Sequence, residues 1–305
     1  MTRQIYYTFS ASAPPAEPTQ EDDLYIEPIP YPVGGGYFAS KAWEGSDSST
    51  VTRKSFERYW TPEQITTQLW LDASDETTIT KDGSDLVSEW RDKSGNNRHA
   101  TASGGTMPTF DTNKIVLTQD EMFVDATFVG NNFGVFVIAS INNTSDRYAR
   151  LFSMRSNLYA HDYDNTSSWL PLNRSDSTIN IQNYCNGLGS PSYSVSYGVL
   201  NLYSSMMYSN GRRLFANGID MGFVGQSGIS INSTAGMKIG QSNFANDENW
   251  DGDVCETIIT YDNTDAIRQK IEGYLAHKWD TINDNNNLKD LLPVDHPYKT
   301  NPPTV

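Results

Sequence analysis

The sequence predicts an all-β fold, an antiparallel β-sandwich with one C-terminal amphipathic helix and an extended N-terminal arm. The composition is rich in Ser, Thr, Asn, Gly and Tyr, with 37% hydrophobic and only 19% charged residues, which is typical of short strands joined by polar turns. Strand-length apolar runs recur along the chain, whereas only one long segment has helical periodicity. The 305 residues suit one sandwich of about 200–250 residues plus the arm.

Residues 1–60 are predicted to form the extended arm. Repeated proline and the run Gly34–Gly36 exclude helix interiors and central strands. The same stretch is rich in large apolar side chains, which pure linkers avoid. We therefore expect the arm to dock, either on its own sandwich or on a neighbouring subunit or larger assembly. The candidate docking residues are Tyr6, Tyr7, Phe9, Tyr25, Tyr31, Tyr37 and Phe38.

Strand and turn signals begin after the arm. Thr61–Gln64 has a capping Thr, Pro at the first helical position and Gln three residues after the cap, which predicts a helical turn before a strand at Gln68–Leu71. The pairs Asn210-Gly211 and Asn217-Gly218 predict tight hairpins on either side of a strand at Arg212–Ala216. Further strands are predicted at Leu86–Trp90, Lys114–Leu117, Met122–Phe128, Phe133–Ile141, Ala149–Met154 and Tyr193–Leu202.

One amphipathic helix is predicted at residues 264–279. Thr264 is its expected cap and Asp265 lies in its first turn. An extended, proline-containing C-terminal strap follows, so residues 61–305 are predicted to be one sandwich domain. The predicted apolar face of the helix comprises Ile267, Ile271, Tyr274, Leu275 and Trp279.

Charge and hydropathy exclude several classes of partner. The net charge is −15 and no Lys/Arg cluster occurs, which excludes nucleic acid as an expected partner. No apolar run approaches the roughly 20 residues of a membrane span, and the first residues lack the apolar core of a secretory signal. We therefore expect that the protein does not insert into a membrane and that it is assembled in a cytoplasm. Cys185 and Cys255 are either two buried free thiols or one disulfide.

Six segments stand in a characteristic order along the chain: LWLDASD at Leu69–Asp75, WRDKSGN at Trp90–Asn96, the hairpin Arg213–Gly218, the strand Met237–Gly240, the strand Gly252–Tyr261 and the helix Asp265–Trp279. Taken in this order, they resemble the concanavalin A-like, laminin-G-like jelly-roll superfamily. The resemblance implies one sandwich from about Tyr59 to Pro303 and does not cover the arm. That superfamily includes lectins, glycosidases, adhesion modules and virion proteins, so the fold does not decide the function.

The first two segments look like modules found in phage and other virus structural proteins. This resemblance implies a non-enzymatic virion structural protein, a capsid decoration or a tail or fibre component. It would be displayed at the virion surface after assembly in the host cytoplasm, and its arm would dock it to the major capsid or tail protein. A homo-oligomer is expected. The alternative is a carbohydrate-binding adhesin for host surface glycans, and a weaker alternative is a glycan hydrolase.

No catalytic residue is predicted. Sandwich glucanases carry paired carboxylates as Glu-x-Asp-x-Glu on one strand, where alternation places them on one face. No such string occurs in this sequence. This absence disfavours the hydrolase alternative.

The polar stretches around two tryptophans suggest a glycan site, because sugar sites combine a flat aromatic ring with nearby amide and carboxylate groups. The candidate residues are Tyr163, Asn165, Trp169, Asn249 and Trp250, and ordinary loop packing is the alternative. Trp70, Trp90 and Trp279 are assigned to the core.

Calcium is the only cofactor considered. Asp247, Asn249 and Asp251 imitate the first half of a calcium loop, but Ile258 stands where the loop requires a bidentate Glu. No complete metal site is therefore predicted, and no other cofactor is expected.

Overall fold

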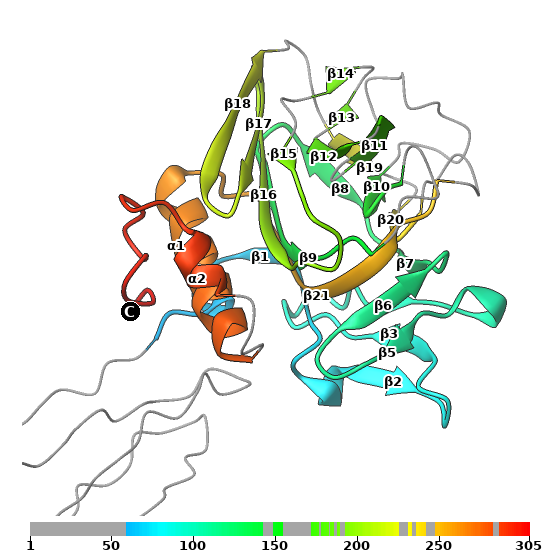
Figure 1. Cartoon of the computed structure of the whole chain (residues 1–305). Coiled ribbons are helices and arrows are strands. Elements are labelled where there is room, and N and C mark those ends of the chain that lie inside the picture. The colour runs from blue at the N-terminus through cyan, green and yellow to red at the C-terminus, as the bar shows by residue number, and fades with distance from the viewer. Residues whose placement is uncertain are drawn as a thin grey trace, which may run out of the picture.

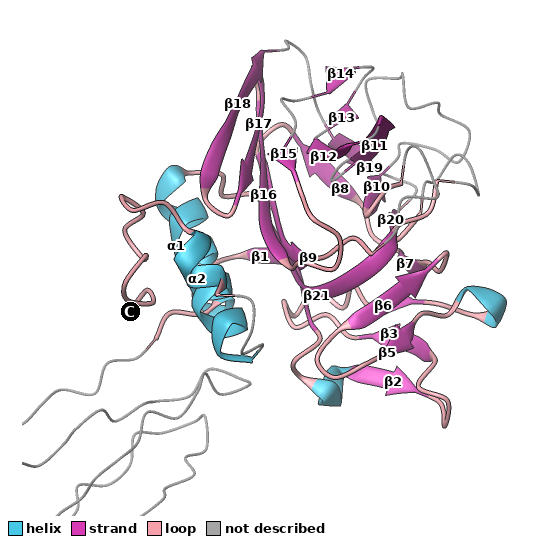
Figure 2. Cartoon of the chain, in the orientation of Figure 1, coloured by secondary structure: helices cyan, strands magenta, loops and turns pink. Residues whose placement is uncertain are grey.

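The computed structural model describes residues 59–142, 149–154, 172–176, 178–182, 184–185, 188–189, 193–225, 231–233, 236–241, 248–282 and 287–305. Antiparallel strands are the main regular structure of this part, and a single long helix follows the last strand (Figures 1 and 2). The predicted all-β sandwich with a C-terminal helix is confirmed. All but the last two residues of the predicted arm lie outside the described residues.

Two main sheets form the sandwich. Every strand pairing in both is antiparallel, as predicted. The larger sheet has eight strands: β18 (Ile219–Gly225), β17 (Gly211–Ala216), β16 (Asn201–Tyr208), β9 (Phe133–Ala139), β21 (Asp251–Thr260), β6 (Ile115–Thr118) and β5 (Thr109–Phe110), with β1 (Thr67–Asp72) pairing to β21. The smaller has six, in the order β10 (Phe152–Met154), β20 (Met237–Ile239), β7 (Met122–Val124), β4 (Ala100–Thr101), β3 (Val87–Trp90) and β2 (Ile79–Lys81).

Three small sheets and several helical turns complete the fold. The sheets are β11 (Leu172–Asp176) with β12 (Thr178–Gln182) and β15 (Tyr193–Ser194), β13 (Tyr184–Cys185) with β14 (Leu188–Gly189), and β19 (Ile231–Ser233) with β8 (Phe128–Gly130). The helical elements are η1 (Pro62–Gln64), η2 (Glu76–Thr78), η3 (Gly104–Thr106), α1 (Asp265–Ile282) and α2 (Leu288–Leu291). None of the helices in the described part of the chain has the length and apolar character that crossing a bilayer requires.

The central strands of the larger sheet are buried on both faces. On β9, the side chains of Phe133, Val135 and Val137 belong to the core between the two sheets. Those of Phe136 and Ile138 belong to a second core under α1, which we name the helix-side core. Successive side chains of a strand point to opposite faces, so a central strand covered on both sides is apolar throughout. Figure 1 shows α1 on one side of the larger sheet and β2, β3 and β7 on the other.

The C-terminal helix begins where the sequence predicts. The Arg268 amide donates to the Thr264 carbonyl at 2.9 Å, and the predicted apolar face lies in the helix-side core. The helix runs to Ile282, three residues beyond the predicted end at 279. Ile282 lies three residues after Trp279 and continues the apolar face onto the same core, which explains the extension.

The beginning and the end of the described sandwich lie side by side. The Trp60 amide donates to the Pro303 carbonyl at 2.9 Å, and Tyr59 forms an antiparallel bridge with Thr304. Trp60 packs in the helix-side core, so both ends are fixed on the side of α1. The predicted C-terminal strap is therefore an ordered part of the fold.

Two predicted strands are interrupted. The segment predicted as a strand at Met122–Phe128 divides into β7 and β8, and the one at Tyr193–Leu202 divides into β15 and β16. In the second case Gly198 has a φ of +68°, which L-residues rarely adopt and which ends an extended strand. Apolar residues lie on both sides of each break, so the sequence pattern alone predicts one continuous strand.

The predicted position of one of the two Asn-Gly turns differs from the position in the structure. Asn217 and Gly218 have φ of +50° and +75° and form the predicted tight turn. Gly211, however, is already paired in β17 opposite Tyr208, so the first hairpin loop is residues 209–210. Gly211 is needed for another reason, because a Cβ there would lie 2.4 Å from the Phe223 ring.

Cys255 is a free, buried thiol in the helix-side core. Burial, reinforced by the nearby Asp253 carboxylate, raises the pKa of this thiol well above its ordinary value. In a Cys185→Ser background we expect Cys255 to react with a thiol-specific disulfide reagent only after denaturation, because the thiolate is the reactive form. Labelling followed by absorbance at neutral pH checks this. Rapid labelling of the folded protein would contradict the placement of Cys255.

Candidate functional site

Trp250 does not belong to a glycan site. Its side chain is 0% exposed in the core between the sheets, and its Nε1 donates to the Ser140 carbonyl at 3.0 Å. A buried indole presents no ring face to a sugar, so this prediction is wrong. The polar residues that flank Trp250 in the sequence do not surround its ring. The other predicted aromatic and amide residues, Tyr163, Asn165 and Trp169, lie outside the described residues.

Of the calcium candidates, the structure describes Asn249 and Asp251 and places neither in a metal-ligand set. Asn249 is only 8% exposed, and its Oδ1 accepts a hydrogen bond from Gln241 Nε2 at 2.7 Å. Asp251 opens β21 and pairs with Thr118, and Asp247 lies outside the described residues. Within the described ranges, no group of three or more His, Cys, Asp or Glu side chains is arranged to hold a metal ion.

Glu256 is the centre of a buried polar network under α1. Its side chain is 0% exposed, and both of its oxygens accept two hydrogen bonds. Oε1 accepts from Trp70 Nε1 at 2.7 Å and from the Tyr274 hydroxyl at 3.0 Å. Oε2 accepts from Lys278 Nζ and Trp279 Nε1, both at 2.7 Å. Four convergent hydrogen-bond partners suit a buried carboxylate.

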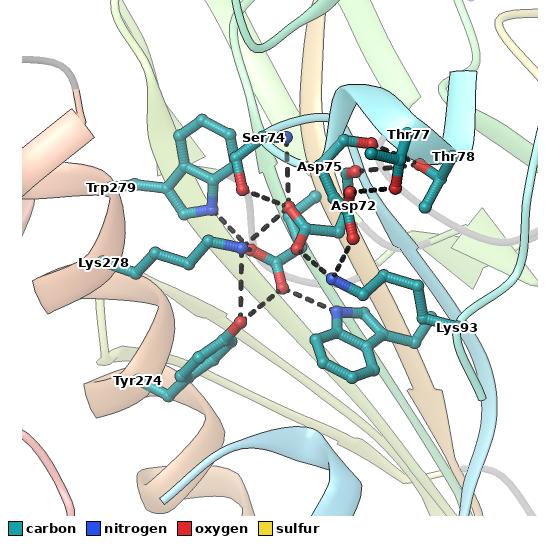
Figure 3. Close-up of polar contacts among 11 residues, drawn as sticks. Asp72, Ser74, Asp75, Thr77, Thr78, Lys93, Tyr274, Lys278 and Trp279 are labelled. Atoms are coloured by element: carbon teal, nitrogen blue, oxygen red, sulfur yellow. Dashed lines mark hydrogen bonds and ion pairs between the residues drawn. The ribbon is translucent and has the colours of Figure 1, made fainter. Parts of the chain in front are cut away.

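Asp72 extends this network from α1 to the segments LWLDASD and WRDKSGN (Figure 3). Lys278 Nζ lies 2.7 Å from Asp72 Oδ1, and Lys93 Nζ lies 2.9 Å from Asp72 Oδ2 and 3.0 Å from Asp75 Oδ2. Burial alone would raise the pKa of Asp72, but the two lysines outweigh it and hold that pKa well below its usual range. Burial raises the pKa of Glu256, and Lys278 opposes the rise.

This network accounts for the two motif segments in structural terms. Trp70, Asp72 and Asp75 come from LWLDASD, and Lys93 comes from WRDKSGN. The network joins β1, β21 and α1, three elements that are distant in the sequence. No substrate reaches carboxylates that are this deeply buried, so the network stabilises the fold rather than performing chemistry. Sequence analysis did not find it, although a Glu within the apolar strand at Asp251–Thr260 was a usable signal.

The outer face of the six-stranded sheet is different because it is open to solvent. Inward residues such as Met122 and Val124 pack in the core, so the residues between them point outward. Strand register aligns five outward residues, one on each of five adjacent strands. We name this set the transverse row: Thr80 on β2, Glu89 on β3, Thr101 on β4, Phe123 on β7 and Lys238 on β20.

Phe123 is the aromatic residue of the transverse row. Its ring lies against the backbone of Gly236, where an added Cβ would be 2.5 Å from Phe123 Cζ and 2.7 Å from Cε2. Gly236 has a φ of +83°, so both its conformation and the ring above it require glycine. The ring is thereby held across the start of β20 and stays partly exposed. A ring fixed in this way forms a flat apolar platform on an otherwise polar face.

Paired charges flank the platform on both sides. Lys238 forms an ion pair with Glu121 and donates to Gln241 Oε1 at 2.8 Å. Gln241 in turn holds Asn249, the one predicted glycan residue that the structure connects to this face. Two residues of separation place Glu121 and Phe123 on the same side of β7.

A second charge pair lies on the other side of Phe123. Arg91 Nε donates to Glu89 Oε1 at 3.0 Å. The Thr80 and Thr101 side chains lie on either side of Glu89 in the row and are exposed. The face therefore offers hydroxyl, amide, carboxylate and cationic groups around one ring, all held in fixed register by the sheet.

No model of a protein family matches the chain, and no curated protein matches it. Similar solved structures include a Trypanosoma rangeli sialidase in complex with sialic acid, with 11% identity and a TM-score of 0.47 over 65% of this chain and 31% of the sialidase chain. Another is domain 4 of AbnA, a GH43 extracellular arabinanase from Geobacillus stearothermophilus, in complex with arabinotriose, with 13% identity and a TM-score of 0.42 over 63% of this chain and 91% of that domain. A GH54 α-L-arabinofuranosidase has 12% identity and a TM-score of 0.46, covering 67% of this chain and 58% of its own.

The chain thus spans about a third of the length of the sialidase it matches. Because all three TM-scores are below 0.5, these likenesses carry no argument about fold, activity or ligand. Membership of the concanavalin A-like superfamily stays a prediction. The arm residues lie outside the described residues, so docking through the arm, the virion role and the homo-oligomer also stay predictions.

Proposed function

We propose that this chain is a non-catalytic glycan-binding module that binds sugar on the outer face of its six-stranded sheet. One observation carries the proposal. The transverse row presents a fixed, partly exposed aromatic ring, Phe123, with hydrogen-bonding side chains aligned on both sides of it.

The chemistry of the face matches that of a sugar. A pyranose or furanose ring has an apolar C–H surface, which packs on an aromatic ring, and a rim of hydroxyls, each of which both donates and accepts. Binding sites of this type combine apolar contact with a few fixed polar groups that set orientation. Here the Thr101 hydroxyl, the Glu89 carboxylate and the Lys238 ammonium supply those polar groups.

The same groups favour binding over hydrolysis. Glycosidases need one carboxyl group free to donate a proton and a second to act as nucleophile or base. Glu89 and Glu121, the carboxylates that the structure describes beside the row, are each paired with a cation. A carboxylate held in an ion pair is already engaged and is not free for either role.

Phe123→Ala tests the proposal, with Phe223→Ala as a matched control. Phe223 also lies over a glycine and is 41% exposed, but it is on β18 at the edge of the larger sheet. We expect Phe123→Ala to weaken binding to an immobilised glycan array about tenfold or more, because one aromatic contact contributes about 1 kcal/mol beyond the area it buries. Phe223→Ala should bind as the unmodified protein does.

The midpoint of urea unfolding, measured for both variants, shows that each is folded under the binding conditions. Equal binding by the Phe123→Ala variant and the unmodified chain would refute the assignment of this face. An array on which the unmodified chain binds no glycan would refute the proposed function itself.

A further inference from the structure

We infer that the glycan is uncharged, extended and several sugar units long, and that it lies across the strands rather than along them. This inference rests on the proposed function of the same face. It follows from two properties of the transverse row, its charge pairing and its dimensions.

The charges on this face are already balanced within the protein. Lys238 is paired with Glu121, and Arg91 is paired with Glu89. An anionic glycan would have to displace a carboxylate from its cation before gaining a charge-assisted contact, and it would approach a molecule of net charge −15. A neutral glycan needs neither displacement nor charge compensation, because its hydroxyls bond to groups that remain paired.

The row is long across the strands and short along them. It crosses five strands, so at a spacing of about 4.8 Å its outer members are about 19 Å apart. In the other direction β2, β7 and β20 are three residues long and β4 is two, which is about 7–10 Å at roughly 3.3 Å per residue. A flat strip with these proportions accommodates a chain of sugar units only along its long axis.

Phe123 and Lys238 lie towards one end of the strip, and Thr80 and Glu89 lie at the other. A disaccharide placed on the Phe123 ring would leave the other end of the row, at Thr80 and Glu89, without contacts. Each added unit along the strip gains polar contacts until the row is covered. Affinity should therefore increase with chain length and then stop increasing.

Isothermal titration with a defined panel tests the inference. The neutral arm is a series of cello-, xylo- and malto-oligosaccharides from disaccharide to hexasaccharide, and the anionic arm is hyaluronan and polysialic acid oligomers of matched length. We expect at least one neutral series to bind with an affinity that increases with length to a plateau. The anionic oligomers should bind at least about tenfold more weakly, a difference of about 1.4 kcal/mol.

Two charge variants sharpen the test. Glu121→Gln leaves the Lys238 cation without its carboxylate partner and should increase the affinity for the anionic oligomers about tenfold. Asp280→Asn is the matched control, because Asp280 is the carboxylate that pairs with Lys289 at 2.7 Å on the α1 side of the sandwich, and its removal should not change glycan affinity. Tighter binding of anionic than of neutral oligomers, or full affinity already at the disaccharide, overturns this inference and leaves the proposed function intact. Failure of every neutral and anionic oligomer to bind overturns both.

Discussion

Lys278→Met is expected to lower the free energy of unfolding by about 3–5 kcal/mol, the usual cost of removing one partner from a buried ion pair. Lys278 is the only described cation that contacts both Asp72 and Glu256, each at 2.7 Å. Without it, Glu256 stays buried as a charge held only by neutral donors. The cost therefore comes mainly from the unpaired carboxylate rather than from lost packing, since Met fills a similar volume.

Urea unfolding followed by tryptophan fluorescence measures this cost, and Trp70 and Trp279 report directly because both donate to Glu256. Lys289→Met is the matched control. Lys289 pairs with Asp280 at the same 2.7 Å, but its side chain is 42% exposed, so its loss should cost at most about 1 kcal/mol. Similar losses for the two variants would mean that the buried network does not hold α1 to the sheet.

Trp250→Ala is expected to destabilise the fold by a similar amount, about 3–5 kcal/mol, because it removes a fully buried indole from the core between the sheets. Glycan binding by the fraction that remains folded should be unchanged. The same titration used for the Phe123 variant, carried out well below the unfolding midpoint, checks this. Loss of affinity without loss of stability would restore Trp250 as a binding residue.

Trp250→Phe separates the two contributions of this side chain. It keeps an aromatic ring in the core but removes the hydrogen bond to the Ser140 carbonyl. We expect a smaller loss in the free energy of unfolding, about 1–3 kcal/mol, from the buried carbonyl left without its donor. A Phe variant as unstable as the Ala variant would contradict this division.

The fold was largely predictable because its signals are local. The helix after Thr264 has a cap and an apolar periodicity, and both survive in the structure. The turn at Asn217-Gly218 is likewise predicted by two adjacent residues, both of which adopt positive φ. The prediction failed where a strand ends without a change in apolar pattern, as it does at Gly198. Such an ending depends on pairing with another strand, which the sequence of the segment does not contain.

The candidate site was not predictable in the same way. Thr80, Thr101 and Lys238 are neighbours only because strand register aligns them, and no spacing in the sequence links them. Trp250, one of the two tryptophans predicted for the glycan site, has polar neighbours in the chain, whereas its ring lies in the core. Of the two predicted glycan residues that the structure describes, Asn249 contacts Gln241 at the edge of the open face and Trp250 does not. The register of the strands and the face to which each side chain points are determined by the folded sheet and not by the local sequence.

The meeting of Tyr59 with Thr304 determines how this sandwich is presented. Both ends of the described sandwich lie on the side covered by α1, whereas the transverse row lies on the far side of the sandwich (Figure 1). A support joined after Val305 therefore lies behind the sandwich, with the six-stranded sheet facing away from it. Immobilisation by a C-terminal tag should leave the outer sheet accessible, so the position of the described ends gives the sandwich a front and a back.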